Sequence, residues 1–290
     1  MPTPYDIRKL SHVEFPERLA EIPEPPKEMW LAGALPSPET VLLSVVGARK
    51  YTAYGREACE TLIAGLAGYD IAIVSGLALG IDAIAHESAI RAGLATIAVP
   101  GSGLDSKVLY PRVHVQLAQR ILDAGGALLS EFPPETRAAL WTFPKRNRIM
   151  AGMAQATLLI EAGAKSGTLI TARLAADYNR DLMAVPGSIF SPLSHGTNQF
   201  IALGATPVSS SEDVLRVLGF DIGPTDTSEH FDLSLFGGSE LAILELLNEP
   251  MPREKIFEQL EMTASETNIT LMKLEIAGHI VDTPEGVRRK

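Results

Sequence analysis

Short apolar runs alternate with helix-forming stretches from residue 41 to about residue 220 of this 290-residue chain. Each switch between the two patterns is marked by Gly, Ser or Pro. Runs without polar alternation suit strands that are buried on both faces, as in parallel sheets covered by helices. The pattern therefore predicts a doubly wound α/β domain. Its expected strands are Val41–Val46, Ile71–Ser75, Thr96–Pro100, Ala127–Ser130, Thr157–Glu161, Leu182–Pro186 and Thr206–Ser209.

Three stretches between these runs carry apolar residues at helical spacing, namely Tyr54–Ala67, Ile81–Ala92 and His114–Ala124. Ligands of doubly wound sheets bind outside the carboxyl ends of the strands. We therefore expect the functional residues in the loops that follow the strands.

The predicted α/β domain spans residues 36–220 and follows an N-terminal extension, residues 1–35. Residues 221–238 lose the periodicity and are rich in Gly, Pro, Asp and Ser, which is typical of a linker. Three amphipathic helices and a β-wing in residues 239–290 predict a small winged-helix domain. Its expected elements are helices at Glu240–Leu247, Arg253–Leu260 and Ser265–Ala277, a strand at His279–Asp282 and a turn at Pro284–Gly286.

The formal net charge of −10 argues against a broadly basic surface for duplex DNA or membranes. A nucleic-acid site would have to be a local basic patch on an acidic protein. No run approaches the roughly 18 uncharged apolar residues that span a bilayer, and the N-terminal segment lacks the apolar centre of a secretion signal. We expect a soluble, cytoplasmic protein. The single cysteine, Cys59, lies in a helical pattern and is expected to be a buried apolar residue.

Gly47 and Arg49 follow the first strand of the domain directly and precede a helix. Glycine lets the backbone approach an anion, helix N-terminal N–H groups attract negative charge, and arginine offers a charged fork for phosphate. An ordinary strand–helix turn with a solvated arginine explains this loop equally well, so both interpretations stay open here.

Ser75, Gly76 and Gly80 surround the turn after the second strand and form a second candidate anion site. Asp82 falls in the first turn of the next helix, where the helix dipole favours a carboxylate, and His86 could pair with it four residues later. We favour a structural role for both. Two such residues do not make a metal site, and no third ligand of suitable spacing accompanies them.

Three cations, Lys145, Arg146 and Arg148, fall within four positions, with Phe143 upstream and Asn147 between them. Cations supply affinity for the backbone, an aromatic ring supplies a stacking face for an unpaired base, and asparagine can position either. A charge run is usually a solvated face. Because this one leads into an apolar stretch and a core strand, it is expected at a rim of the sheet.

Lys165, Ser166, Gly167 and Thr168 precede the helix after the next strand. Ser166 or Thr168 could simply cap that helix. Alternatively, the hydroxyls and free N–H groups could hold a phosphate beside Lys165.

Other ligand and reaction classes are poorly supported. Residues 101–106 half resemble a dinucleotide fingerprint but lack its third glycine and follow the wrong strand. Residues 163–168 contain Walker-type residues in the wrong order, and no nucleophile–base arrangement with credible spacing is present. We expect no cofactor and no catalytic residue.

Taken in order, the loops resemble those of the DNA-processing protein A family (DprA/Smf) over about residues 15–220. The last segment is similar to the winged helix that follows this domain in many members. The motifs are Gly-Ala-Arg at 47–49 with Tyr54-Gly55, SGLALGIDAIAH at 75–86, GLD at 103–105 with Tyr110-Pro111, LLSEFP at 128–133, FPKRNRIMAG at 143–152, EAGAKSGTLITA at 161–172, and AVPG at 184–187 with Gly196-Thr197-Asn198.

The resemblance implies a Rossmann-like domain that binds single-stranded DNA in natural transformation and recombination, protects it, and loads the RecA recombinase onto it. It also implies a homodimer formed through this domain, and no enzymatic activity. The arginine of the first loop, Arg49, would contact phosphate. The full expected DNA-binding set is Gly47, Arg49, Ser75, Gly76, Gly80, Phe143, Lys145, Arg146, Asn147, Arg148, Lys165, Ser166, Gly167 and Thr168.

The chain departs from the family pattern in two places. Ala48 stands where the family usually has Ser or Thr, which removes one hydroxyl donor. Many relatives carry an N-terminal SAM-like helical domain, whereas Tyr5–Leu35 runs almost directly into the first strand, so we expect that domain to be missing.

The expected winged helix, residues 239–290, has six Lys or Arg against ten Asp or Glu. A negative module is a poor independent duplex binder and is expected to be an interaction or regulatory module.

Two alternatives remain. Nucleotide-processing enzymes of related Rossmann-like architecture use similar glycine loops, and Glu161 is the attractive acid/base candidate for such a reaction here. Nucleotide hydrolysis that is lost in Glu161→Gln would favour the enzyme. A purely structural module would bind neither DNA nor nucleotide.

Overall fold

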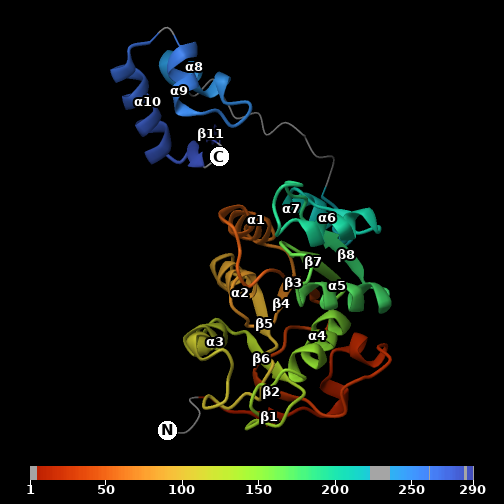
Figure 1. Cartoon of the computed structure of the whole chain (residues 1–290). Coiled ribbons are helices and arrows are strands. Elements are labelled where there is room, and N and C mark those ends of the chain that lie inside the picture. The colour runs from red at the N-terminus through yellow and green to blue at the C-terminus, as the bar shows by residue number, and fades with distance from the viewer. Residues whose placement is uncertain (1–4, 223–235, 261, 284–285, 290) are drawn as a thin grey trace. The chain divides into compact units, whose positions relative to one another are not determined.

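Nine strands form one sheet in the first of two units of the computed structural model, Met1–Ile222 (Figure 1). The structure describes residues 5–222, 236–260, 262–283 and 286–289. In spatial order the strands are β1 (Arg8–Lys9), β2 (Trp30–Gly33), β6 (Ala127–Ser130), β5 (Ala95–Ala98), β4 (Ile71–Ser75), β3 (Val41–Val46), β7 (Ala156–Leu159), β8 (Asp181–Ala184) and β9 (Thr206–Pro207).

Strand β3 is the point from which the sheet is wound in two directions. The chain passes from β3 to β4, β5 and β6 on one side and then crosses to β7, β8 and β9 on the other. Strands β3 to β9 pair in parallel, with Leu43 of β3 opposite both Ile73 of β4 and Ala156 of β7. The predicted doubly wound, mostly parallel α/β fold is confirmed. In such a fold, the crevice where the winding direction reverses is the usual ligand site.

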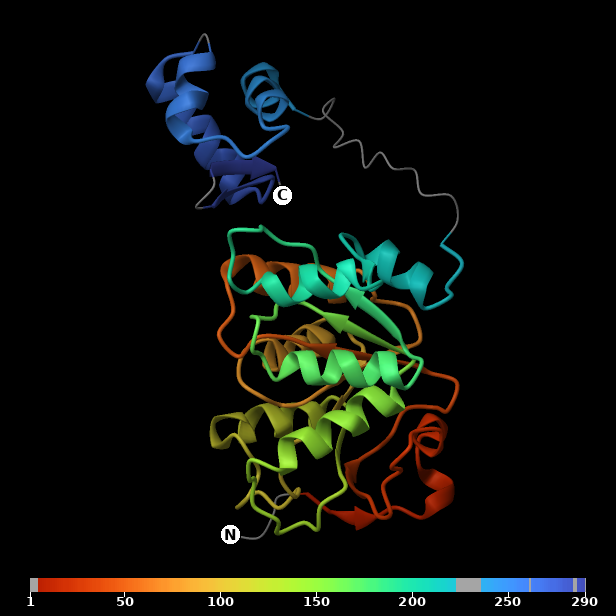
Figure 2. The same cartoon turned by 45° about the vertical axis from the view of Figure 1, so that its right-hand side comes forward.

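Successive residues of the central strands enter opposite cores. On β3, Leu43 and Val45 join the core made with α1 (Ala53–Ala64), α2 (Ile81–Arg91) and α7 (Ser211–Val217). Leu42 and Val46 join the core made with α4 (Thr142–Met153), α5 (Thr168–Asp177) and α6 (His195–Ala202). Helix α3 (Val115–Asp123) covers β5 and β6 (Figures 1 and 2). Burial on both faces explains why these strands show no polar alternation.

The strands predicted at β5, β7, β8 and β9 each extend two residues beyond the observed carboxyl end, whereas the strand predicted at β6 has the observed bounds. The backbone explains part of this difference. Val99, Ile160 and Val185 follow the observed ends of β5, β7 and β8, and each still donates its N–H to the neighbouring strand or its end. The chain turns away after these residues, so their apolar character continues the strand pattern into the loops.

The N-terminal segment is part of the α/β unit, whereas the sequence predicted an extension that precedes it. Strand β2 pairs antiparallel with β6, and β1 pairs with β2. Leu19 and Ile22 are buried in the core that includes α4. Arg180 is 7% exposed and donates hydrogen bonds to the carbonyls of Arg18 and Gly152, which fastens this segment to the domain.

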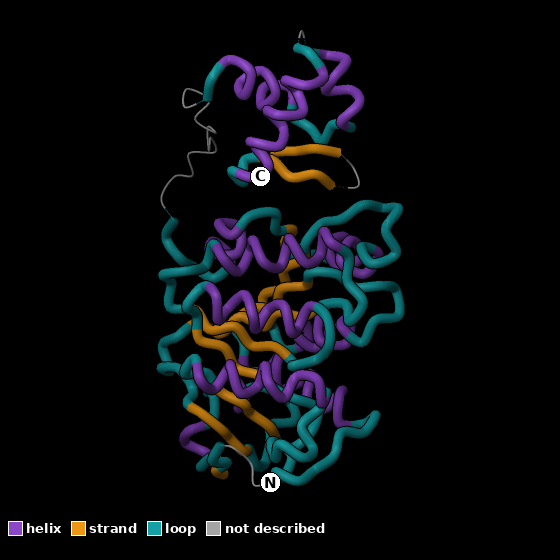
Figure 3. Tube along the Cα trace, turned by 90° about the vertical axis from the view of Figure 1, so that its left-hand side faces the viewer, coloured by secondary structure: helices purple, strands orange, loops and turns teal. Residues whose placement is uncertain are grey.

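The second unit, Gly223–Lys290, has its own apolar core. Figure 3 shows its helices and its pair of strands. Its described elements are α8 (Gly238–Leu246), α9 (Arg253–Gln259), α10 (Ala264–Ile276), β10 (Ile280–Thr283) and β11 (Gly286–Arg289). The two strands form an antiparallel hairpin, and Thr263 and Glu266 cap α10 reciprocally. Residues 223–235 of the predicted linker and residues 284–285 of the predicted turn lie outside the described residues. Across the described ranges, no helix is long and apolar enough to cross a membrane.

His86 of α2 is a completely buried imidazole between α2 and β5. Its Nδ1 lies 2.7 Å from Thr96 Oγ1, and the Thr96 hydroxyl donates to the carbonyl of Ile73. His86 Nδ1 is therefore the donor to Thr96. Burial lowers the pKa of His86 to about 3. His86 thus pairs with Thr96 and not, as suggested, with Asp82.

We expect His86 to make the protein less stable in acid. The unfolded chain takes up a proton at the ordinary histidine pKa of about 6.5, whereas the folded protein keeps the ring neutral down to about pH 3. Titration of His86 therefore leaves the free energy of unfolding unchanged above pH 6.5. This free energy falls as the pH falls from 6.5 to about 3. His86→Gln should reduce the pH slope of the free energy of unfolding by up to about 1.4 kcal/mol per pH unit below pH 6. Urea unfolding between pH 7.5 and pH 4.5 measures both slopes, and identical slopes would contradict this account.

Candidate functional site

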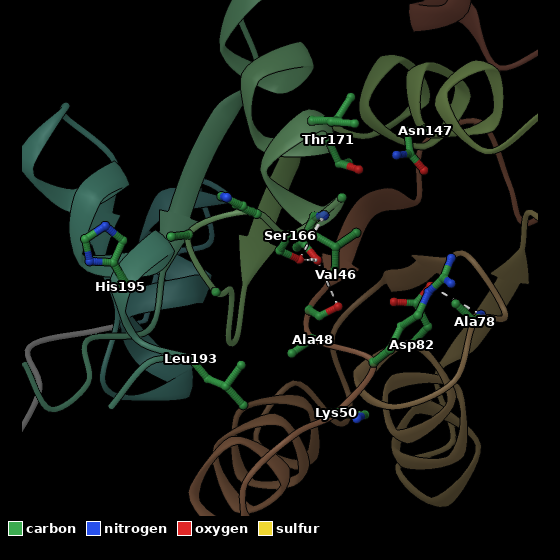
Figure 4. A pocket seen from close by; sticks show the side chains of 18 of the residues that line it. Val46, Ala48, Lys50, Ala78, Asp82, Asn147, Ser166, Thr171, Leu193 and His195 are labelled. Atoms are coloured by element: carbon green, nitrogen blue, oxygen red, sulfur yellow. Dashed lines mark hydrogen bonds between the residues drawn. The ribbon is translucent and has the colours of Figure 1, made fainter. Parts of the chain in front are cut away.

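A pocket of about 950 Å³ opens where the loops after β3, β4 and β7 meet. Figure 4 shows Ala78, Asp82 and Asn147 to one side of it and Leu193 and His195 to the other. Further lining residues come from α4 and from the loops before α5 and α6. The pocket therefore lies at the point where the winding of the sheet reverses, as expected for a ligand site of this fold.

Gly47 and Gly80 allow the loop after β3 and the loop after β4 to pack closely against each other. A Cβ on Gly47 would lie 2.6 Å from Ile81 Cγ1, and a Cβ on Gly80 would overlap the carbonyl of Ala48. Gly80 also has a φ of +84°, which favours glycine. Both glycines, predicted to let an anion approach, thus have a packing role.

Arg49 and Phe143 come together at the pocket, although they lie far apart in the sequence. Arg49 is exposed, and its guanidinium carbon lies 5.5 Å from the centroid of the Phe143 ring. The same ring meets Tyr110 edge to face at a centroid distance of 5.7 Å. The structure thus places a charged fork beside an aromatic face, a pairing of two separate segments that the sequence did not predict.

Arg146 is buried, which differs from its predicted place in an exposed basic patch. It is 5% exposed, and its Nη1 donates to the carbonyls of Gly76 and Val99. Its Nε donates to Asn147 Oδ1. These bonds attach α4 to the carboxyl ends of β4 and β5, so the guanidinium acts within the protein.

The carboxylate of Asp82 balances this buried charge. It accepts hydrogen bonds from the N–H groups of Gly76 at 3.1 Å and Ala78 at 3.3 Å. Burial raises the pKa of Asp82 and lowers that of Arg146, while the attraction between the two charges opposes both shifts. The predicted structural role of Asp82 agrees with this arrangement, but the N–H of Gly76 is thereby used and is not free for an anion.

The other cations of the predicted patch differ in their surroundings. Arg148 pairs with Glu131 and donates to the carbonyl of Glu24. Lys145 is exposed, and its Nζ lies 5.2 Å from the Trp141 ring centroid. Lys145 therefore presents its charge to solvent, while Arg148 uses its charge within the protein.

Ser75 is also used internally, because its hydroxyl donates to the carbonyl of Val45 and its side chain is buried.

The loop before α5 lines the pocket and is held by hydrogen bonds of Ser166 and Thr168. Ser166 Oγ accepts from the N–H of Thr168, and the Thr168 hydroxyl donates to the carbonyl of Gly47 at 2.9 Å. Both side chains line the pocket, as do Gly167 and the exposed Lys165. Gly167, and not Ser166 or Thr168, is the N-cap residue of α5, so the predicted cap by one of these side chains is wrong. The alternative, that this loop holds a phosphate beside Lys165, stays a prediction.

Glu161, the acid/base candidate of the enzyme alternative, stabilises the start of α1. It is 1% exposed and accepts from the backbone N–H of Thr52 at 3.0 Å and from its hydroxyl at 2.6 Å. It is not among the residues that line the pocket. Among the described residues, no group of His, Cys, Asp and Glu could hold a metal ion.

Two apolar residues of the site went unpredicted. Ile189 and Phe190 lie in the loop before α6, line the pocket and are 85% and 89% exposed. Their sequence signal was weak, since they interrupt a Gly-, Ser- and Pro-containing loop that otherwise marks only a turn.

The different surroundings of adjacent cations predict different effects on stability. Arg146→Met should lower the free energy of unfolding by about 3 kcal/mol, because two buried carbonyls lose their donor and Asp82 loses its counter-charge. Lys145→Met, the matched control on the same helix, should change it by at most about 0.5 kcal/mol. Urea denaturation at pH 7 compares the two variants. Equal effects would show that Arg146 is not the structural residue described above.

Comparisons with known proteins show the family. The model of the DNA recombination-mediator protein A family matches residues 7–219. Protein Smf of Escherichia coli is 35% identical over 285 residues, which cover 95% of this chain and 75% of that protein. DNA processing protein DprA of Bacillus subtilis is 37% identical over 214 residues, covering 72% and 70% of the two chains.

Solved structures agree with this assignment. DNA processing protein A of Streptococcus pneumoniae matches with a TM-score of 0.66 at 36% identity and covers 73% of this chain and 74% of its own. DNA processing protein A of Helicobacter pylori, whose structure was solved to describe its single-stranded DNA binding mode, also has a TM-score of 0.66. It is 27% identical and covers 75% of this chain and 98% of its own. The chain therefore belongs to the DNA recombination-mediator protein A family, whose members are named DprA or Smf.

Proposed function

We propose that this protein binds single-stranded DNA in the pocket at the carboxyl ends of β3, β4 and β7 and acts in natural transformation and recombination. The observation that carries the proposal is the contact of the exposed Arg49 guanidinium with the Phe143 ring in this pocket. The relative from Helicobacter pylori, which binds single-stranded DNA, supports the same ligand.

The charges around the pocket suit a sugar-phosphate backbone. Arg49, Lys50 and Lys165 are exposed cations of its lining. Asp82, the carboxylate among the described lining residues, is buried and accepts two backbone hydrogen bonds. The pocket is thus locally positive on a chain of net charge −10, which limits phosphate attraction to this region.

The Phe143 ring favours an unpaired strand as the ligand. Every base has two faces that can stack on an aromatic ring, but in a duplex these faces are occupied by neighbouring base pairs. Arg49 beside the ring would bind the phosphate that accompanies the stacked base. The proposed binding groups are therefore Arg49, Phe143 and Lys165, with Lys145 contributing from the exposed face of α4.

The proposed role in the cell is to protect single strands and to load RecA onto them, as a homodimer formed through the α/β domain and without catalysis. The description of the family as recombination mediators supports the RecA step. The internal role of Glu161, which accepts from Thr52, supports a protein that does not turn over nucleotides.

The second unit is proposed to be a winged-helix module that contacts protein partners. The order of three helices followed by two antiparallel strands supports this assignment. Ile269, Met272 and Ile276 of α10 are 52%, 57% and 84% exposed, and Lys273 is a cation on the same helix. A helix that reads duplex DNA would present several cations or amides, so this apolar surface favours contact with protein.

Titration of a labelled single strand at several salt concentrations tests the proposed site. Arg49→Ala and Lys145→Ala should each weaken binding for all sequences and flatten the salt slope by about 0.7 to 1, since each removes about one phosphate contact. Arg120→Ala removes an exposed arginine of α3 that pairs with Glu87 and serves as the control. If both site variants bind like the control, the DNA does not occupy this pocket.

A further inference from the structure

The loop between β8 and α6 exposes two large apolar side chains beside a cationic pocket. Ile189 and Phe190 are 85% and 89% exposed, and both belong to the pocket lining. Single exposed apolar residues are ordinary, but two adjacent ones at a ligand pocket indicate a binding surface. The proposed contacts of Arg49 and Phe143 with DNA leave this surface without a role.

Both sides of the loop are fastened to the domain. Asn198 accepts from the N–H of Gly187 at 3.2 Å and donates back to its carbonyl at 2.9 Å. The carbonyl of Leu193 accepts from the N–H of Ala162 at 2.7 Å. A Cβ on Gly187 would overlap the Ser194 hydroxyl, so this end of the loop packs closely.

The tip of the loop is held as well. The N–H of Phe190 donates to Ser188 Oγ at 3.2 Å, and the N–H of Ser191 donates to the carbonyl of Ser188 at 3.0 Å. These bonds fix the backbone that carries Phe190 while its ring remains in solvent. A ring held in this way loses little further backbone freedom when a ligand stacks on it.

The remainder of the lining indicates which ligand group would meet the ring. The loops after β3 and β7 supply Arg49, Lys50 and Lys165, which suit phosphate. Phe190 carries no charge and offers a flat apolar face, which suits a base. A volume of about 950 Å³ exceeds what a single stacked nucleotide on Phe143 requires.

We propose that Phe190, supported by Ile189, is a second stacking platform that binds an unpaired nucleobase in the same pocket as Phe143. This inference rests on the proposed function and deepens it. The pocket would then hold two bases of one strand, with phosphate bound by the cations between them. Because every base has an apolar face, the platform would not select a particular base.

Phe190→Ala tests the platform with two probes, an oligothymidylate strand and a strand of the same length with abasic sites throughout. The variant should bind the intact strand about 5-fold to 150-fold more weakly, which corresponds to the loss of one base–aromatic stack. Its affinity for the abasic strand should match that of the unchanged protein. Its salt slope should also be unchanged, because no phosphate contact is removed.

Two further variants complete the experiment. Phe190→Trp should restore the affinity for the intact strand, since the larger ring also stacks. Val13→Ala removes an apolar side chain that is 93% exposed outside the pocket, and it should leave both affinities unchanged.

Three outcomes would overturn the inference. Phe190→Ala could bind the intact strand as tightly as the unchanged protein, or it could weaken the abasic strand equally. Sedimentation could instead show that Phe190→Ala dissociates a dimer while DNA affinity is retained, so that a second copy covers the loop. In each case the unchanged protein still binds single strands, and the proposed function stands. Failure of the unchanged protein to bind them would overturn both.

Discussion

The site depends on one buried cation, the guanidinium of Arg146. It binds the carbonyls of Gly76 and Val99, at the ends of two neighbouring strands, and so fixes the start of α4 over the edge of the sheet. A Cβ on Gly76 would overlap Arg146 Nη1, so the strand end and the guanidinium fit together only with glycine at this position. Phe143 lies one helical turn before Arg146 and is thereby held where its ring meets Arg49.

Burying a charge in this way is costly unless it is balanced, and Asp82 supplies the balance. The cations of the site therefore have two different roles. Arg146 is used to build the pocket, whereas Arg49 and Lys165 keep their charges exposed within its lining. A ligand phosphate would therefore meet the exposed cations and not the buried Arg146. The acidic remainder of the chain would repel DNA elsewhere, which favours binding at the pocket.

The sequence predicted the central strands well, because burial on both faces leaves a continuous apolar run. It did not predict that β2 joins the sheet, since the short segment Trp30–Gly33 carries few strand-forming residues. The pairing of β2 with β6 depends on a strand almost a hundred residues later, and local patterns do not report it.

For the site as well, local sequence patterns did not report contacts that depend on the tertiary fold, and the segment with Lys145, Arg146 and Arg148 is an example. Composition revealed three clustered cations but not which of them would face solvent. The helix places Arg146 on the face that also carries the buried Ile149 and Met150, so the i, i+3, i+4 spacing was the available signal. The pairing of Arg148 with Glu131 had no such signal, because it depends on the tertiary fold. Similarly, the role of Glu161 depends on Thr52, which lies far away in the sequence.

Photocrosslinking of a single strand that contains 5-iodouracil, followed by mass spectrometry of the crosslinked peptides, tests the central claim most directly. The central claim is that unpaired bases occupy the pocket beside Arg49 and Phe143. The account predicts that crosslinks concentrate in the peptides that carry Phe143 and Phe190. Crosslinks confined to α10 or to the β10–β11 hairpin, with none in the pocket peptides, would contradict it.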